Sequence, residues 1–253
     1  MNNKKEIKIV VKNLTTSYNK VIVLKNVSFE VYKGEVFVIL GGSGCGKSTL
    51  LKHMIGLYKP DSGSIFIDDS DIVTSKGNDR LKLIKKFGVM YQTGALFGSM
   101  TISQNVMLPI EEFTNLPKEA IYNIALMKLQ LVGLKGFENH MPSEISGGMQ
   151  KRAAIARAMA LDPQIIFLDE PSAGLDPITS AELDELICNL SQNLNITFVI
   201  VTHELPSIYS IAHRVIMLDK RIKGIVATGK PEYLRDNSEN EWVRQFFNRQ
   251  SKL

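Results

Sequence analysis

The stretch from Gly41 to Thr49 constrains this chain more than any other. It reads Gly-Gly-Ser-Gly-Cys-Gly-Lys-Ser-Thr and fits the pattern G-x-x-x-x-G-K-[ST]. An apolar run, Val36 to Leu40, precedes it and predicts a buried strand, and apolar residues at helical spacing follow it up to Gly56. Glycines let backbone N–H groups turn inward around an anion, and a helix start adds the positive end of its dipole. The stretch therefore predicts a phosphate-binding loop, rather than a glycine-rich turn that binds nothing.

The residue types in this loop indicate which atoms would meet the phosphates. Lys47 would reach the β- and γ-phosphates of a nucleotide, and the Ser48 hydroxyl would hold Mg²⁺. The full set of candidate nucleotide contacts in the loop is Gly41, Gly42, Ser43, Gly44, Cys45, Gly46, Lys47, Ser48 and Thr49.

A second apolar run ends in two carboxylates. Residues 164–170 predict a buried strand that ends in Asp169 and Glu170. Asp169 can bind Mg²⁺ through water, and Glu170 can polarise the water that attacks a phosphoryl group. The competing interpretation is an acidic pair that only faces solvent, but the phosphate-binding loop favours the metal site.

Three single residues are candidates that depend on this context. Tyr18 lies in a predicted turn and could stack on an adenine ring or simply pack on the surface. Gln92 ends a predicted strand over residues 88–92 and can offer its amide oxygen to a metal or to a water, although a lone glutamine is usually a surface residue. His203 follows a predicted strand over residues 195–202, where ligands of open parallel sheets collect, but a single histidine is commonly structural.

Ser146, Gly147 and Gly148 precede an alanine-rich helix predicted from Lys151 to Ala160. Ser146 suits the N-cap position, and the two glycines leave backbone N–H groups unobstructed. The segment is either a second anion site at a helix start or only a capped helix. Asp176 with Pro177 likewise predicts the N-cap and first position of the next helix.

The composition is ordinary for a soluble globular protein of one domain. The chain has 253 residues, of which 44% are hydrophobic and 22% are charged. The net charge of +4 comes from basic residues that are spread along the chain, so it does not favour nucleic-acid binding. No apolar run approaches the roughly 20 residues of a membrane-spanning helix, and the N-terminus lacks a signal-peptide pattern. We expect a cytoplasmic protein in which Cys45 and Cys188 are free thiols.

The other patterns predict how the chain is divided. Residues 6–13 and 21–32 resemble antiparallel strands, and residues 81–87 a short helix. Helical periodicity runs from Met100 to Asn139, with Pro117 at a first helical position, and predicts a helical subdomain over about residues 100–160 inserted into the sheet domain. Residues 214–219 and 224–228 predict two edge strands.

The last segment, residues 230–253, is predicted to be a polar tail beyond a domain that spans residues 1–229. Trp242 and Phe246 are four residues apart, as are Val243 and Phe247, which predicts a short amphipathic helix. That helix either docks on its own domain or contacts a second subunit.

Taken in this order, the motifs resemble the ATP-binding subunit of ABC transporters over about residues 6–229. The matched positions are the adenine-stacking Tyr18, the Walker A residues 41–49, the Q-loop Gln92, the signature Ser146-Gly-Gly-Met149, the Walker B Asp169 with the catalytic Glu170, the D-loop residues 172–176 and the switch His203. The signature departs from the usual Leu-Ser-Gly-Gly-Gln at Ile145 and Met149, which puts only the glutamine side chain's contribution in doubt.

The resemblance implies an α/β fold of the P-loop ABC ATPase type. It has a mixed, mainly parallel core sheet, an N-terminal antiparallel β-subdomain and an inserted α-helical subdomain. It also implies ATP and Mg²⁺ as ligands, with Ser48, Gln92 and Asp169 at the metal. Glu170, His203, Lys47 and Gln92 would carry hydrolysis. Two copies would pair head to tail, so that Ser146, Gly147 and Gly148 of one face the ATP of the other and Asp176 couples the two sites.

Finer features resemble the ATPases of Mla-type phospholipid transporters, which are associated with Mce-domain proteins. They are residues 91–101, residues 170–179 and the tail's Trp242-Val-Arg-Gln-Phe-Phe-Asn248. The resemblance implies an integral membrane permease and a periplasmic Mce-domain protein as partners, with the chain on the cytoplasmic face of the inner membrane.

Two alternatives remain open. One is the ATPase of an importer for a polar solute such as an amino acid or peptide, since signatures with methionine also suit some peptide importers. The other is a soluble, non-transport ABC ATPase that acts on DNA or ribosomes. The absence of heptad runs and of a second Walker A motif disfavours it.

Overall fold

The computed structural model describes residues 6–249. Its central sheet has six strands in the order β10-β9-β3-β8-β7-β6. Five of them run parallel, and β10 pairs antiparallel with β9 at one edge. The strands are β3 (Val36–Gly41), β6 (Phe87–Met90), β7 (Ile165–Asp169), β8 (Thr197–Val201), β9 (Arg214–Asp219) and β10 (Gly224–Gly229). The predicted mixed, mainly parallel core sheet is confirmed.

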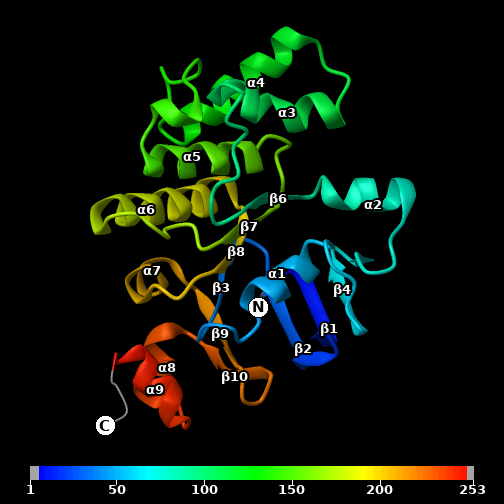
Figure 1. Ribbon diagram of the computed structural model, residues 1–253, viewed down its shortest axis with the longest axis vertical. Helices are drawn as coiled ribbons and strands as arrows, with labels where there is room; N and C mark the ends of the chain where they lie inside the picture. Colours follow the sequence, from blue (N-terminus) through cyan, green and yellow to red (C-terminus); the bar gives the residue numbers. More distant parts are fainter. Residues whose placement is uncertain (1–5, 250–253) are drawn as a thin grey trace, which may run out of the picture.

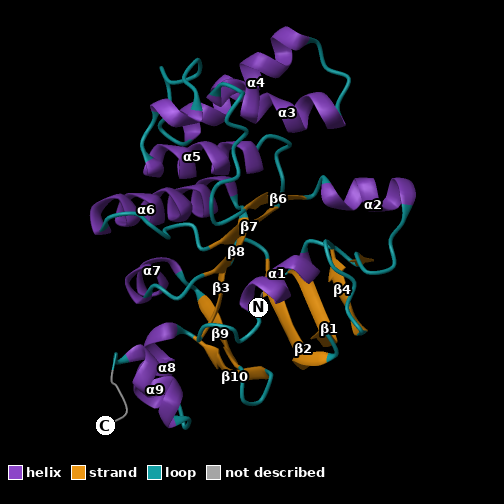
Figure 2. Cartoon of the chain, viewed as in Figure 1, coloured by secondary structure: helices purple, strands orange, loops and turns teal. Residues whose placement is uncertain are grey.

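A second sheet of four antiparallel strands lies beside the first (Figures 1 and 2). Its order is β2-β1-β4-β5, built from β1 (Ile7–Tyr18), β2 (Val21–Tyr32), β4 (Ser62–Ile67) and β5 (Ser70–Asp71). Tyr18 is the last residue of β1 and pairs with Val21, so the predicted turn contains only the two residues between them. The predicted N-terminal antiparallel unit is confirmed, and it also takes in the segment after the first helix.

Helices cover the central sheet, and three of them gather at one end of the molecule (Figure 1). The helices are α1 (Lys47–Met54), α2 (Gly77–Ile84), α3 (Ile102–Phe113), α4 (Lys118–Leu131), α5 (Gly147–Ala158), α6 (Pro177–Leu194), α7 (Leu205–Ile211), α8 (Pro231–Asn237) and α9 (Glu241–Phe247). The group is formed by α3, α4 and α5, the green segments at the top of Figure 1. In the described range, no helix is long and apolar enough to cross a bilayer.

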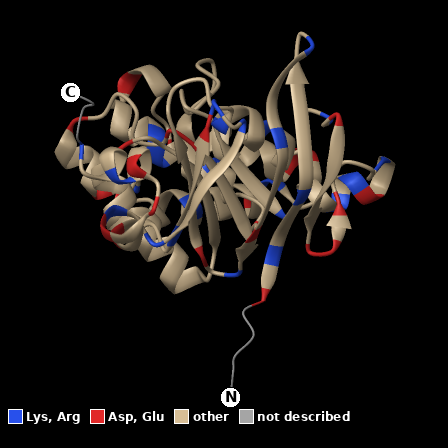
Figure 3. Ribbon diagram, turned by 90° about the horizontal axis from the view of Figure 1, so that it is seen from below, with Lys and Arg blue, Asp and Glu red and all other residues tan. Residues whose placement is uncertain are grey.

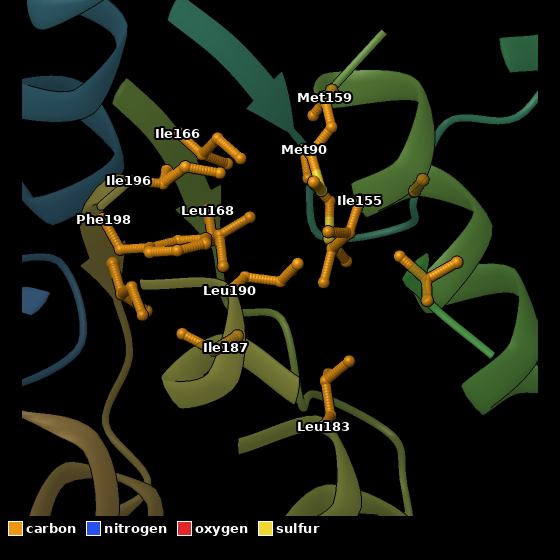
Figure 4. Close-up of a cluster of buried hydrophobic side chains, with 14 of the residues drawn as sticks. Met90, Ile155, Met159, Ile166, Leu168, Leu183, Ile187, Leu190, Ile196 and Phe198 are labelled. Atoms are coloured by element: carbon orange, nitrogen blue, oxygen red, sulfur yellow. The ribbon is translucent and has the colours of Figure 1, made fainter. Parts of the chain in front are cut away.

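The core lies on both faces of the central sheet because successive strand side chains point in opposite directions. In β3, Val36, Val38 and Leu40 join a cluster with α5 and α6, whereas Phe37 and Ile39 join one with α1 and the antiparallel sheet. Figure 4 shows the first cluster, with Met90, Ile155 and Met159 near one another and Leu168, Phe198, Ile187 and Leu190 beside them. Burial on both faces explains why these strands read as uninterrupted apolar runs.

Several predicted boundaries shift. Pro117 is the residue before α4 and not its first residue, and α2 begins at Gly77 and ends at Ile84, earlier than its apolar residues suggested. The alanine-rich helix α5 begins at Gly147, directly after the predicted N-cap Ser146. Since caps are local and periodicity is not, the capped start was the more accurate prediction.

The tail contains two helices, α8 and α9, where one was predicted. Val243 and Phe247 of α9 are buried in the chain's own core, and the Tyr209 hydroxyl of α7 donates to the Phe247 carbonyl at 3.1 Å. The amphipathic face of α9 therefore docks on its own domain. In the face shown by Figure 3, lysine and arginine are interspersed with aspartate and glutamate, so the net positive charge is not gathered in one patch.

Candidate functional site

The candidate residues from four strands meet at one edge of the central sheet. The glycine-rich loop follows β3, Gln92 follows β6, Asp169 ends β7, and His203 follows β8. The registers Ile39↔Val201, Asp169↔Val201 and Met90↔Leu168 bring the carboxyl ends of these parallel strands to the same level. Ligands of open α/β sheets bind at this edge.

The backbone of the glycine-rich loop requires glycine at two positions. Gly41 has φ +147°, and a Cβ there would lie 2.4 Å from the Leu218 carbonyl oxygen. Gly46 has φ +101°, and a Cβ there would lie 2.8 Å from a methyl of Leu24. The loop thus packs tightly against β2 and β9 behind it while its front opens on a cavity.

That cavity has a volume of about 330 Å³. Its lining is Tyr18, Val23, Gly44, Gly46, Lys47, Ser48 and Thr49. Tyr18 is 72% exposed at the rim, so its ring face is available for stacking. Lys47 Nζ donates to the carbonyl oxygens of Gly41 at 2.9 Å and Gly42 at 3.3 Å, so the ammonium lies over the loop.

The remaining loop residues differ in exposure. Gly42, Ser43 and Gly44 are exposed, whereas Cys45 is 2% exposed and lies beneath the loop. Burial raises the pKa of the Cys45 thiol, and Lys47 lowers it in part. The Cys45 N–H donates to the Gly42 carbonyl at 3.3 Å, and its side chain belongs to the core.

Ser48 and Asp169 face each other across the edge of the sheet. Ser48 Oγ donates to Asp169 Oδ1 at 3.3 Å, which joins the start of α1 to the end of β7. Asp169 is 9% exposed, and burial raises its pKa, whereas the hydroxyl of Ser48 lowers it in part. A hydroxyl and a carboxylate are hard oxygen ligands of the kind Mg²⁺ takes, so this pair fits a metal that would also relieve the cost of burying the carboxylate.

Glu170 and His203 form the second contact at this edge. His203 Nδ1 lies 2.9 Å and 3.0 Å from the two carboxylate oxygens of Glu170. Because a carboxylate only accepts, Nδ1 is the donor, and the other ring nitrogen is left for another partner. Glu170 has a positive φ of 48°, and its N–H donates to the Val201 carbonyl at 2.8 Å. Positive φ in a non-glycine residue is uncommon and collects at functional sites.

Gln92 is exposed on the turn after β6, one strand away from Asp169. Its backbone carbonyl accepts a hydrogen bond from Lys151 Nζ of α5. This backbone contact holds Gln92 at the sheet edge where the Asp169 and Glu170 carboxylates lie.

Ser146, Gly147 and Gly148 are not among the residues that line the loop's cavity. Ser146 Oγ accepts from the Met149 N–H at 3.3 Å and caps α5, as predicted. A Cβ at Gly148 would lie 2.4 Å from Cγ2 of Thr179, so the start of α5 rests on the start of α6. Within one chain, this helix start and the glycine-rich loop contribute to separate surfaces.

Asp176 caps α6, as predicted. Its Oδ1 accepts from the N–H groups of Ile178 and Thr179, both at 3.0 Å, and its Oδ2 accepts from the Thr179 hydroxyl at 2.5 Å. These bonds, the one from the Thr179 hydroxyl most of all, lower the pKa of Asp176. The carboxylate is exposed beside the start of α5.

The sequence analysis missed two basic residues that hold the turn after β6. Lys151 is 7% exposed and bonds Gln92, and Arg157 donates to the carbonyls of Gly94 and Ala95, both at 2.7 Å. Lys151 shares a helical face with the buried Ala154 and Ala158. A lysine on an otherwise apolar face was the signal in the sequence.

Three comparisons bear on these residues. A family model described as "ABC transporter" matches residues 24–173. The "Probable ribonucleotide transport ATP-binding protein mkl" of Mycobacterium leprae (strain TN) is 44% identical over 240 residues, which cover 95% of this chain and 68% of that protein. The "Intermembrane phospholipid transport system ATP-binding protein MlaF" of Escherichia coli (strain K12) is 42% identical over 225 residues, covering 88% of this chain and 82% of that protein.

A solved structure shares the fold. It is described as the "Dimeric structure of a post-hydrolysis state of the ATP-binding cassette MJ0796 bound to ADP and Pi". It superposes with a TM-score of 0.79 at 32% identity and covers 88% of this chain and 98% of that chain.

Proposed function

The chain belongs to the ABC transporter family, and we propose that it is the ATP-hydrolysing subunit of a transporter that moves phospholipid between the inner and outer membranes. The phospholipid substrate is supported by the 42% identity to a protein named for intermembrane phospholipid transport, of which the chain covers 82%. The observation that carries the ATPase part is the meeting of Ser48 with Asp169 and of Glu170 with His203 at one sheet edge.

The loop from Gly41 to Thr49 binds the phosphates of ATP. Its backbone N–H groups and the start of α1 supply positive partial charge around the anion. Lys47 exchanges its bonds to the Gly41 and Gly42 carbonyls for bonds to the β- and γ-phosphates. Tyr18, exposed at the rim of the cavity, stacks on the adenine.

Ser48, Asp169 and Gln92 hold Mg²⁺. The first two already bring their oxygens within 3.3 Å of each other, and Gln92 adds an amide oxygen from the neighbouring strand. When bound, the metal offsets the negative charge of the phosphates.

Glu170 orients the attacking water and accepts its proton as the water oxygen bonds the γ-phosphorus and the bond from that phosphorus to ADP breaks. His203 is oriented by its Nδ1 bond to Glu170, and in the doubly protonated imidazolium its other ring N–H donates to the γ-phosphate. The left-handed backbone at Glu170 turns this carboxylate away from the strand direction and toward the histidine.

Ser146, Gly147 and Gly148 serve the ATP of a second copy of the chain. They lie at a helix start but do not line this chain's own cavity. Their N–H groups therefore complete the donors around a nucleotide only in a head-to-tail pair, which has two equivalent sites. Asp176, exposed beside them, couples the two sites. The dimeric state of the cassette in the solved relative supports the same arrangement.

The partners we propose are an integral membrane permease and a periplasmic Mce-domain protein. The chain would bind the permease on the cytoplasmic face of the inner membrane, with Gln92 and the residues after it facing the permease. The name of the Mycobacterium leprae relative favours a second candidate, in which the cargo is a ribonucleotide and thus a polar solute.

The test of hydrolysis is Glu170→Gln. We expect this variant to bind ATP with the parent's affinity, to lose hydrolysis by about a thousandfold and to accumulate as a dimer with ATP. Calorimetry, phosphate release and size-exclusion chromatography measure the three properties. Hydrolysis at the parent rate would remove Glu170 from the reaction.

The test of the substrate uses affinity purification of the tagged chain from membranes of its host. Recovery of an Mce-domain protein with the permease supports phospholipid transport. Recovery of a periplasmic solute-binding protein instead would support the polar-solute candidate, and recovery of no membrane protein would point to a soluble ATPase.

A further inference from the structure

The helix α5 contacts the turn after β6 along most of its length. Two side chains of this helix bond three carbonyls of that turn: Lys151 bonds the Gln92 carbonyl, and Arg157 bonds the carbonyls of Gly94 and Ala95. The same turn makes one backbone bond of its own, from the Gly94 N–H to the Tyr91 carbonyl at 2.7 Å. The position of Gln92 therefore depends on α5 more than on the turn itself.

The apolar packing beneath these bonds is equally close. Figure 4 shows Met90, the last residue of β6, against Ile155 of α5 and Met159, the residue that follows α5. A Cβ at Gly88 would lie 2.0 Å from the Ala158 carbonyl oxygen, and one at Gly94 would lie 3.4 Å from the Ala154 methyl. The helix and β6 with its turn are packed too closely to shift against each other without breaking these contacts.

Lys151 connects the first half of α5 to the turn that carries Gln92. It is five residues along the helix from Ser146, which corresponds to a rise of about 7.5 Å. It is 7% exposed; burial lowers its pKa, whereas the carboxylates of Glu170 and Glu204 raise it. The lysine thus lies within the field of the residue proposed to orient water while it bonds the backbone of a proposed metal ligand.

The start of α5 is fixed on its other side as well. Gly148 contacts Thr179 of α6, and Arg152 bonds Glu182 of α6 at 2.9 Å. A displacement of Ser146 is therefore transmitted along α5 as a whole, and Lys151 is where it reaches the turn that carries Gln92.

We propose that Lys151 is a positioning residue for hydrolysis, which fixes Gln92 in one nucleotide site from the helix whose first turn completes the other site. This inference rests on the proposed function. Lys151 is not among the residues that line the loop's cavity, and it acts through the Gln92 backbone. Loss of the ammonium frees the Gln92 carbonyl, while Arg157 still bonds Gly94 and Ala95. Gln92 is then misplaced, which slows hydrolysis but leaves the phosphate-binding loop intact.

The test compares Lys151→Met with Lys128→Met. Lys128 is 5% exposed in α4 and bonds Asp162, so it is an equally buried lysine that does not touch the turn. We expect Lys151→Met to lower kcat about tenfold with KM within about twofold of the parent, and Lys151→Arg to recover most of the loss. Lys128→Met should lower the melting temperature to a similar degree with kcat within about twofold of the parent.

Hydrogen exchange of residues 91–96 gives a readout that does not depend on activity. Exchange there should be faster in Lys151→Met than in the parent and unchanged in Lys128→Met. If Lys151→Met fails to fold, Arg157→Met, which frees the Gly94 and Ala95 carbonyls, carries the same comparison.

An unchanged kcat and unchanged exchange in a folded Lys151→Met protein would overturn the positioning role, as would an equal loss of kcat in Lys128→Met. A parent chain that hydrolyses no ATP would overturn the proposed function instead. The exchange of residues 91–96 then decides whether Lys151 holds the turn.

Discussion

Two glycine-containing helix starts in this molecule look alike in the sequence but differ in the structure. The loop before α1 has Gly41, Gly44 and Gly46 at positive φ and encloses a cavity of about 330 Å³. At the start of α5, Gly147 and Gly148 are already helical, and Ser146 only caps them. The first is a site built by one chain, whereas the second is a donor surface that needs something outside the chain to face it.

The two helix starts also differ in the elements that they contact. The loop before α1 is backed by Leu24 and Leu218 and reaches Asp169 through Ser48, so its position is set by three strands. The start of α5 packs on the start of α6. Further along α5, Lys151 bonds the turn after β6. The two helix starts are thus supported by different elements, and the following variants separate their roles.

The largest effect is expected from Lys47→Ala, which breaks the first region. Its ammonium is the one that would meet the phosphates. Removal of one such charged donor lowers the rate of hydrolysis about a thousandfold, which corresponds to ~4 kcal/mol in activation free energy. Calorimetry should show weaker ATP binding by the isolated chain, because this site does not need a partner. An unaltered dissociation constant would contradict the phosphate-binding loop.

The next largest effect concerns α6, the helix on which the second region rests. Asp184 is 4% exposed, and burial, with a contribution from the Glu204 carboxylate, raises its pKa to about 6, although the Ser207 hydroxyl lowers it in part. The folded chain thus binds the Asp184 proton more tightly than the unfolded chain, in which the pKa of this carboxyl is 3.8. The stability that protonation contributes is complete below pH 3.8 and is lost as pH rises through 6.

Asp184→Asn should therefore stabilise the protein above pH 6, by up to about 3 kcal/mol. The gain over the parent should shrink as pH falls from 6 toward 4. Urea unfolding at pH 7.5 and pH 5 measures both values, and a gain that is equal at the two pH values would contradict a raised pKa.

Gly148→Ala is expected to have a smaller effect, and it breaks the second region alone. The new methyl would clash with Cγ2 of Thr179 at 2.4 Å and tilt the start of α5. Hydrolysis should fall about tenfold, or ~1.4 kcal/mol, while ATP affinity of the isolated chain stays at the parent value. Thr179→Ser removes that methyl but keeps the hydroxyl bond to Asp176, so the double variant should recover hydrolysis. No recovery would mean that the contact is not the cause.

The smallest effect is expected from Ser146→Ala. Loss of the cap should lower the free energy of unfolding by about 1 kcal/mol. Hydrolysis should fall as well if the hydroxyl serves the partner's nucleotide, as we propose. Thr101→Ala is the control, since the Thr101 hydroxyl caps α3 in the same way at 3.2 Å. It should lose similar stability and keep hydrolysis; equal activity in both variants would leave Ser146 as a cap only.

The sequence predicted the parts of this molecule that local chemistry determines. The caps at Ser146 and Asp176 and the strand, loop and helix around Lys47 are found in the structure, because each depends on residues within a few positions of one another. The apolar runs predicted buried strands, and β3, β7 and β8 are buried along their whole length.

What the sequence did not predict depends on contacts between distant residues. The Ser48–Asp169 and Glu170–His203 distances follow from strand order, and the Lys151 bond to Gln92 joins residues 59 positions apart. Helices α7 and α8 were not predicted; each has seven residues, as does α9, which was predicted from its two apolar pairs four residues apart. The roles of the candidate residues in catalysis stay predictions that the variants above decide.

The thiol of Cys45 is buried beneath the glycine-rich loop, so its reaction with a labelling reagent reports whether the loop is open. A maleimide can alkylate this sulfur only when the loop lifts, whereas the half-buried Cys188 on α6 serves as an internal reference in the same molecule. The ratio of the two labelling rates measures how often the loop opens, and a nucleotide that clamps the loop shut should slow the first rate without touching the second.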